Sequence, residues 1–229
     1  MTVPDASPVR ARQHAGPDPI PIEPVTCVRL TYRYLTAVDI EGFSSQHTLA
    51  QVLMQADLGW VLDTAANRAH LDRARWHLQE RGDGELAVLP SDTDGPRLIA
   101  DYPREVEHAL SELNDDRRRR IRIRIAMHHG TLVQGRRFGP AGQGPVVVSR
   151  LLESDELRKY LAQRPELDLV LIVSASLYHD VIETRLHRLD PAEFTPIDIY
   201  VKGGSYPAYI YYANHPVSAT ETANAEMAS

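Results

Sequence analysis

Two aspartates, each at the end of an expected strand and followed by an expected turn at Gly42 or Gly84, offer the ligands that a phosphate-bound metal ion takes. Asp39 ends the apolar run of residues 28–39, and Asp83 lies between two glycines in an expected hairpin turn. If the first strand and the hairpin are neighbours, both carboxylates point to one place. Two carboxylates and phosphate oxygens are the ligands that Mg²⁺ or Mn²⁺ takes. Asp83 is equally well explained as a simple turn residue, since Asp and Gly dominate turns.

Composition allows one folded domain and excludes several classes of protein. The chain has 229 residues, 43% apolar residues and a net charge of −6, enough for a substantial core. Cys27 is the single cysteine, which excludes an internal disulfide and a cysteine-based zinc site. No stretch approaches the roughly 18 apolar residues of a membrane span. We predict a disordered leader over 1–26, a folded domain over 27–214 and a disordered tail over 215–229, in a cytoplasmic protein without membrane contact.

Apolar periodicity predicts strands and helices in alternation, with hairpins between them. After the first strand, helical spacing predicts a long amphipathic helix capped by Ser44 or Ser45, and a second one follows the hairpin. The fold class is therefore α/β, a sandwich of helices on a mixed, mostly antiparallel sheet. The apolar positions of the first helix are Leu49, Val52, Leu53, Ala56 and Trp60, and the later elements are a hairpin over 76–90, a helix over 98–113, a strand over 121–127, a helix over 146–161, a strand over 167–175 and a hairpin over 196–212.

Four further segments, in order after the Asp39 segment, complete a pattern that resembles the class III nucleotide cyclases, the adenylate and guanylate cyclase catalytic domains. The resemblance covers about residues 30–213 and implies a ferredoxin-like core. The segments are Asp39-Ile-Glu-Gly-Phe-Ser44, Gly82-Asp83-Gly84, Ile123-Arg-Ile-Ala-Met-His-His-Gly130, Pro145-Val-Val-Val-Ser-Arg150 and Val201-Lys-Gly-Gly204.

The resemblance implies a role for five residues. Asp39, Asp83 and the Ile40 carbonyl would hold two Mn²⁺ or Mg²⁺ ions, which activate the ribose 3′-hydroxyl and bind the triphosphate. Arg150 would stabilise charge on the α-phosphate, and Lys202 would contact the outer phosphates. Family members work as head-to-tail dimers with shared sites, so the resemblance implies a homodimer. Without it, Arg150 and Lys202 are explained as solvated surface cations.

Three positions depart from the family pattern. Val146 replaces the asparagine expected four residues before Arg150, which removes a hydrogen bond to the ribose. Gln79 and Gly139 occupy the two base-reading positions, so neither an adenine-selecting nor a guanine-selecting side chain is visible. We take Phe43, Gln79, Arg137 and Val146 as the substrate-binding set; further candidates to line the base pocket are Arg136, Phe138, Tyr32 and Tyr34, and each is otherwise a surface or core residue.

In length and in its lack of a sensor domain, the chain is similar to the stand-alone pyrimidine cyclases of the Pycsar antiphage systems. That resemblance implies conversion of UTP to cyclic UMP and pyrophosphate, with the product acting on a separate effector protein. The alternatives are a cyclase making cyclic CMP, an adenylate cyclase, and an inactive nucleotide-binding module. Arg117 to Arg120 could bind nucleic acid, but cations are also favourable at a helix C-terminus and the chain is acidic, so we predict no nucleic-acid partner. The adjacent His128 and His129 suggest a metal site less than one packed and one strand-end histidine, because neighbours on a strand face opposite ways.

Overall fold

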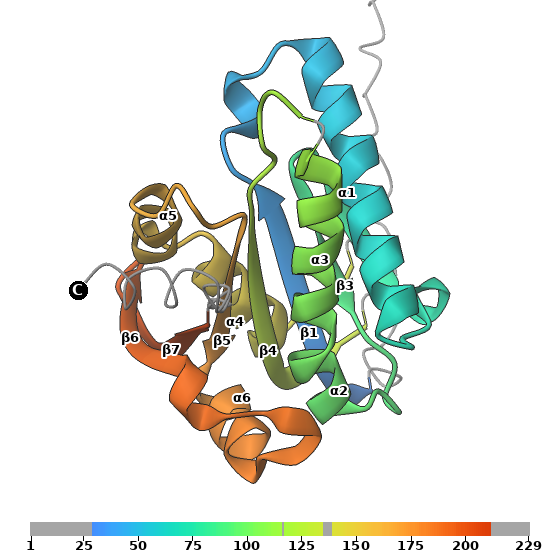
Figure 1. Cartoon of the computed structure of the whole chain (residues 1–229). Coiled ribbons are helices and arrows are strands. Elements are labelled where there is room, and N and C mark those ends of the chain that lie inside the picture. Colours follow the sequence, from blue (N-terminus) through green and yellow to red (C-terminus); the bar gives the residue numbers. More distant parts are fainter. Residues whose placement is uncertain (1–28, 116, 135–138, 212–229) are drawn as a thin grey trace, which may run out of the picture.

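The computed structural model describes residues 29–115, 117–134 and 139–211, which form seven strands in one sheet with helices on both faces (Figure 1). The predicted leader (1–26) and tail (215–229) lie outside these ranges. The strand order is β2-β3-β1-β4-β5-β7-β6, and only the β4–β5 pair is parallel. The strands are β1 (Leu30–Ile40), β2 (His77–Arg81), β3 (Gly84–Val88), β4 (Ile123–Val133), β5 (Leu169–Ser174), β6 (Phe194–Val201) and β7 (Gly204–Tyr211).

Two cores, one on each face of the sheet, follow from the alternation of side chains along the central strands. On one face, Val38 and Ile40 of β1 pack under α1, α2, α3 and α6; on the other, Leu35 and Ala37 pack under α4 and α5. Both predicted hairpins and the mixed, mostly antiparallel sheet are confirmed. The helices are α1 (Thr48–Arg68), α2 (Gly95–Ala100), α3 (Tyr102–Asp115), α4 (Gln143–Leu152), α5 (Asp155–Ala162) and α6 (Ala175–Asp180), with single 3₁₀ turns at Phe43–Ser45, Arg73–Arg75, Ile182–Thr184, Leu186–Arg188 and Pro191–Glu193.

The first helix is present, but the sequence analysis assigned its apolar face to the wrong residues. The core is met by the C-terminal half of α1, through Leu58, Val61, Leu62, Ala65 and Ala66. The N-terminal half extends past the edge of the core, and all five predicted positions are exposed, Ala56 among them. The four larger side chains are Leu49 (65%), Val52 (53%), Leu53 (55%) and Trp60 (46%).

Several local boundaries also differ from the expectation, and the helix expected over 98–113 is divided at Asp101 into α2 and α3. The helix expected over 146–161 is two helices, because α4 ends at Leu152 and Ser154 is the N-cap of α5. The Ser154 side chain accepts a hydrogen bond from the Leu157 amide. The cap of α1 is His47, whose Nδ1 accepts from the Ala50 amide, rather than Ser44 or Ser45. The short helix α6 was not predicted. No helix in the described ranges is both long and apolar enough to cross a bilayer.

The His128–His129 pair divides between the two faces of β4, as predicted, but His129 is not at the strand end, because β4 continues to Val133. His128 is 8% exposed, and its Nδ1 lies 2.8 Å from Ser174 Oγ. Burial lowers the pKa of His128 to about 4, with a smaller contribution from His129. His129 stacks on Tyr34 at 4.0 Å between ring centroids. Neither histidine belongs to a cluster of metal-binding side chains in the described part of the chain.

This burial predicts that the protein loses stability in mild acid. In the unfolded chain His128 is protonated below its ordinary pKa of 6.5, whereas in the native protein it is protonated only below its lowered pKa of about 4. The unfolded state therefore binds more protons between these two pH values, and the free energy of unfolding falls as the pH drops from 6.5 to 4. The contribution amounts to about 3 kcal/mol, at 1.36 kcal/mol per pH unit. Denaturant unfolding at pH 7.5 and 4.5 measures it, and His128→Gln, which keeps a polar group near Ser174, should flatten the difference. Equal pH slopes for the two proteins would contradict this origin.

Candidate functional site

The two aspartates predicted from the sequence are brought to one end of the sheet. Strand β3 pairs with β1 so that Asp39 lies opposite Gly84, and the Ile40 amide donates to the Asp83 carbonyl at 2.9 Å. Gly84 permits this approach: a Cβ there would lie 1.8 Å from the Val38 carbonyl oxygen. Asp39 is buried, whereas Asp83 is exposed at the tip of the β2–β3 turn.

Arg124, which the sequence analysis did not identify as a site residue, holds the Asp39 carboxylate. It lies opposite Asp39 on β4 and donates two parallel hydrogen bonds, Nε to Oδ1 at 2.7 Å and a terminal nitrogen to Oδ2 at 2.8 Å. Burial raises the pKa of Asp39, Arg124 opposes that shift, and the Asp83 carboxylate adds to it. The site therefore combines a buried anion, a like charge beside it and one bidentate cation.

The donor set suits a divalent cation only in part. Asp39 and Asp83 supply hard oxygen ligands, and the Ile40 carbonyl is adjacent in sequence, which is the chemistry that Mg²⁺ or Mn²⁺ requires. No third His, Cys, Asp or Glu joins them within the described ranges, so other oxygen ligands would have to complete the coordination of any cation there. Arg124 occupies both oxygens of Asp39 and would have to share or release them.

The backbone after Asp39 forms the turn that the sequence predicted. Gly42 takes a left-handed conformation (φ 69°), and its carbonyl accepts from Ser45 Oγ at 2.7 Å. The Phe43 ring packs against the core on the α1 side. Phe43 is only partly buried, so part of its side chain remains accessible beside the turn.

Lys202, one of the predicted phosphate ligands, does not meet the aspartates within one chain. Strand directions place the β6–β7 turn, with exposed Lys202, at the end of the sheet opposite Asp39, because β7 runs antiparallel to β5 and β5 antiparallel to β1. Arg150 lies on α4 and pairs with Glu153 at 3.2 Å. Val146 is 41% exposed on the same helix.

The two base-reading positions are brought together. Gln79 on β2 faces the segment before α4, where a Cβ on Gly139 would lie 3.2 Å from Gln79 Oε1. Arg137, with Arg136 and Phe138, lies outside the described residues. Tyr34 lies five residues before Asp39 on β1, which is about 17 Å along the strand, and it stacks on His129 rather than near Gln79.

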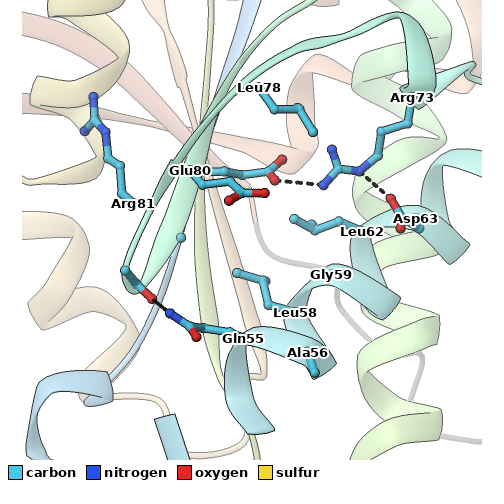
Figure 2. Close-up of a pocket in the computed structure, with 13 residues that line it drawn as sticks. Gln55, Ala56, Leu58, Gly59, Leu62, Asp63, Arg73, Leu78, Glu80 and Arg81 are labelled. Carbon is cyan, nitrogen blue, oxygen red and sulfur yellow. Dashed lines mark hydrogen bonds and ion pairs between the residues drawn. The ribbon is translucent and has the colours of Figure 1, made fainter. Parts of the chain in front are cut away.

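A cavity of about 570 Å³ lies between α1 and the β2–β3 hairpin that carries Asp83 (Figure 2). Arg73 crosses its inner end: its guanidinium pairs with Asp63 of α1 at 2.9 Å and with Glu85 of β3 at 2.7 Å. Near the turn, Gln55 donates to the Gly82 carbonyl at 2.7 Å. These bonds fix the hairpin, and with it Asp83, against α1.

Comparison with known proteins places the fold. No protein-family model matches the chain, and no curated protein matches it. Solved structures do match. An adenylate/guanylate cyclase/hydrolase from Silicibacter pomeroyi is 20% identical, with 82% of this chain and 99% of that chain covered and a TM-score of 0.58.

Two further cyclases give the same result. The guanylyl cyclase Cya2 is 15% identical, with coverage of 83% and 97% and a TM-score of 0.57. The adenylyl cyclase CyaB from P. aeruginosa is 16% identical, with coverage of 83% and 100% and a TM-score of 0.51. At these identities the likeness establishes the fold, which is that of adenylyl and guanylyl cyclase catalytic domains.

The Asp39–Arg124 pair predicts a response to metal that can be measured without turnover. Arg124→Met leaves a buried carboxylate unpaired and should lower the free energy of unfolding by about 3 kcal/mol. If Asp39 is a metal ligand, millimolar Mn²⁺ should raise the melting temperature of Arg124→Met more than that of the wild-type chain.

The matched control is the double variant Arg124→Met/Asp39→Asn. It removes both charges, so it should regain stability relative to Arg124→Met and lose the extra response to Mn²⁺. An equal Mn²⁺ response in the single and double variants would exclude Asp39 as the ligand.

Proposed function

We propose that this protein is a nucleotide cyclase, with UTP as substrate and cyclic UMP and pyrophosphate as products. The observation that carries the proposal is the meeting of Asp39 and Asp83 at one end of a sheet with the cyclase fold. Two carboxylates beside a glycine turn suit a metal-bound triphosphate. Divalent ions bound there would neutralise phosphate charge and lower the pKa of the ribose 3′-hydroxyl.

The chain's own residues would position the substrate. Asp39 and Asp83 would orient the triphosphate through the cations, so that the 3′-oxygen faces the α-phosphorus. The 3′-hydroxyl would lose its proton to water, its oxygen would bond to that phosphorus, the bond from the phosphorus to the bridging oxygen would break, and pyrophosphate would leave. Arg150 would donate to the α-phosphate oxygens as charge builds there, a task that suits a guanidinium fork. Lys202 would contact the departing phosphates.

The base assignment rests on Gln79 and Gly139. The Gln79 amide both donates and accepts hydrogen bonds, and it lies against a position that has no side chain. These features fit a base without the charged reader found in adenylate cyclases. With the resemblance to stand-alone Pycsar cyclases they favour uracil and a role in antiphage signalling, in which cyclic UMP would act on a separate effector. Cyclic CMP or cyclic AMP production is the alternative within the same class.

An inactive nucleotide-binding module is the alternative from another class. Val146, in place of the ribose-binding asparagine, favours it. The presence of Asp39 and Asp83 together with Arg150 and Lys202 opposes it. A protein that only binds a nucleotide does not require two neighbouring carboxylates. Metal-dependent pyrophosphate release separates the two functions.

The direct test offers ATP, GTP, CTP and UTP separately with Mn²⁺ and identifies products by mass. We expect UTP to give cyclic UMP and equimolar pyrophosphate. Asp39→Ala and Asp83→Ala should each lower the rate by about a hundredfold or more, through loss of transition-state charge stabilisation. Asp198→Ala, an exposed aspartate on β6, is the matched control and should retain the wild-type rate. Preference for ATP would overturn the pyrimidine assignment, and no turnover by a folded protein would favour the binding module.

A shared site at a homodimer interface is part of the proposal, because Lys202 lies at the opposite end of the sheet from Asp39. Asp39→Ala and Arg150→Ala should each be inactive alone. Random mixing makes half of the dimers heterodimers with one intact site, so activity should return to about a quarter of wild type. If native mass spectrometry detects heterodimers and the mixture stays inactive, the two residues do not act across an interface.

A further inference from the structure

A second cavity, of about 530 Å³, lies beside the turn that follows Asp39, and its chemistry is unlike that of the first. Arginines of the segment leading into β4 form one wall, and the N-terminal half of α1 forms the other, with Ala50, Leu53 and Met54. Glu41 and Gln46 bring the turn itself to its edge. The arginines that line it are Arg117, Arg118, Arg119, Arg120 and Arg122.

Three of these arginines are neutralised by carboxylates. Arg117 pairs with Asp57, Arg120 pairs with Asp168 at 2.6 Å, and Arg122 pairs with Glu41 at 2.7 Å. Arg122 also donates to the carbonyls of Leu161, Arg164 and Leu167. These side chains hold α1, β1 and the α5–β5 connection together, so they have a structural role.

The other two arginines have no carboxylate partner among the described residues. Arg119 donates only to the neutral Gln46 Oε1, at 2.8 Å, and Arg118 makes no hydrogen bond or ion pair with the described part of the chain. Both are exposed. They follow the end of α3 by three residues or more, beyond the last turn in which a helix dipole favours cations. Two positive charges without a carboxylate partner in the described ranges therefore border a concave surface.

We propose that this basic cavity binds a phosphate-bearing small molecule, with Arg118 and Arg119 as its anion ligands. A guanidinium presents paired N–H donors that match phosphate oxygens, and such charge-assisted bonds are strong. The volume lies within the range of small-molecule sites. The apolar side chains of α1 opposite the arginines would cover an organic group attached to the phosphate.

A ligand held by Arg119 would also act on the candidate active site. Arg119 reaches Gln46, and Gln46 Nε2 donates to the Gly42 carbonyl at 3.2 Å. Gly42 lies in the turn directly after Asp39 and Ile40. Withdrawal of Arg119 to a phosphate would release Gln46 and change the support of that turn. This coupling rests on the proposed function, whereas binding in the cavity does not.

Calorimetric titration of the full chain, with a chelator to remove divalent metal, tests the site. Inorganic pyrophosphate represents a ligand released by the proposed reaction, and UMP represents an organic phosphate taken from solution. For whichever of the two ligands the wild-type protein binds, Arg118→Gln/Arg119→Gln should weaken the affinity by about tenfold or more. Arg185→Gln/Arg188→Gln, which removes two exposed arginines from the α6–β6 connection, should bind as wild type.

The site is supported if either ligand binds to the wild-type protein and to the Arg185→Gln/Arg188→Gln control but binds weakly to the Arg118→Gln/Arg119→Gln variant. Which ligand binds shows whether the phosphate comes from the proposed reaction or from an organic phosphate in solution. Equal weakening in both double variants would reduce the effect to net charge and overturn the proposal, as would no measurable binding of either ligand at millimolar concentration. If the double variant fails to fold by circular dichroism, Arg118→Gln alone decides, because that side chain supports no described contact. Because this experiment measures binding and not turnover, a negative result would not affect the proposal that the protein is a cyclase.

Discussion

The bidentate bond between Arg124 and Asp39 is the constraint on which the candidate site depends. It joins the two central strands, β1 and β4, and fixes which residues stand opposite each other. A slip of one residue would turn Asp39 to the other face and destroy both cores. On the other edge of β1, a separate pairing with β3 sets Gly84 opposite Asp39 and so places the Asp83 turn beside it. The chemistry of the site thus depends on the register of β1 with both of its neighbours.

Strand direction then determines what a single chain can do. The aspartates lie at one end of the sheet, and the Lys202 turn lies at the other. A strand of eight residues spans about 26 Å, so no change of side-chain rotamer could bring Lys202 to the aspartates at the other end of the sheet. A site that needs both ends is therefore complete only when a second copy is placed head to tail. A two-fold axis between two identical chains would make such an arrangement symmetric, with two equal sites.

Local patterns predicted most of the fold, and what they missed depended on partners distant in sequence. Alternation along β4 and the glycines around Asp83 identified the strand and the hairpin. Helical spacing found α1 but not its buried face, because Leu49 and Trp60 repeat as regularly as Leu58 and Leu62, and only tertiary structure decides which stripe meets the core. Arg124 was missed for a related reason: an arginine in an alternating strand is normally solvated, and its partner is known only once the register is.

A structural salt bridge and a metal site make different demands on Asp39. In a buried ion pair that serves only stability, a further negative charge nearby is unfavourable, since the cost of desolvation already cancels much of the attraction between the two partners. Here the Asp83 carboxylate lies close enough to raise the pKa of Asp39 further, against the effect of Arg124. A second negative charge in that position is a cost in the metal-free chain. It would become favourable if a divalent cation lay between the two carboxylates, and this is the physical basis of the metal role proposed for them.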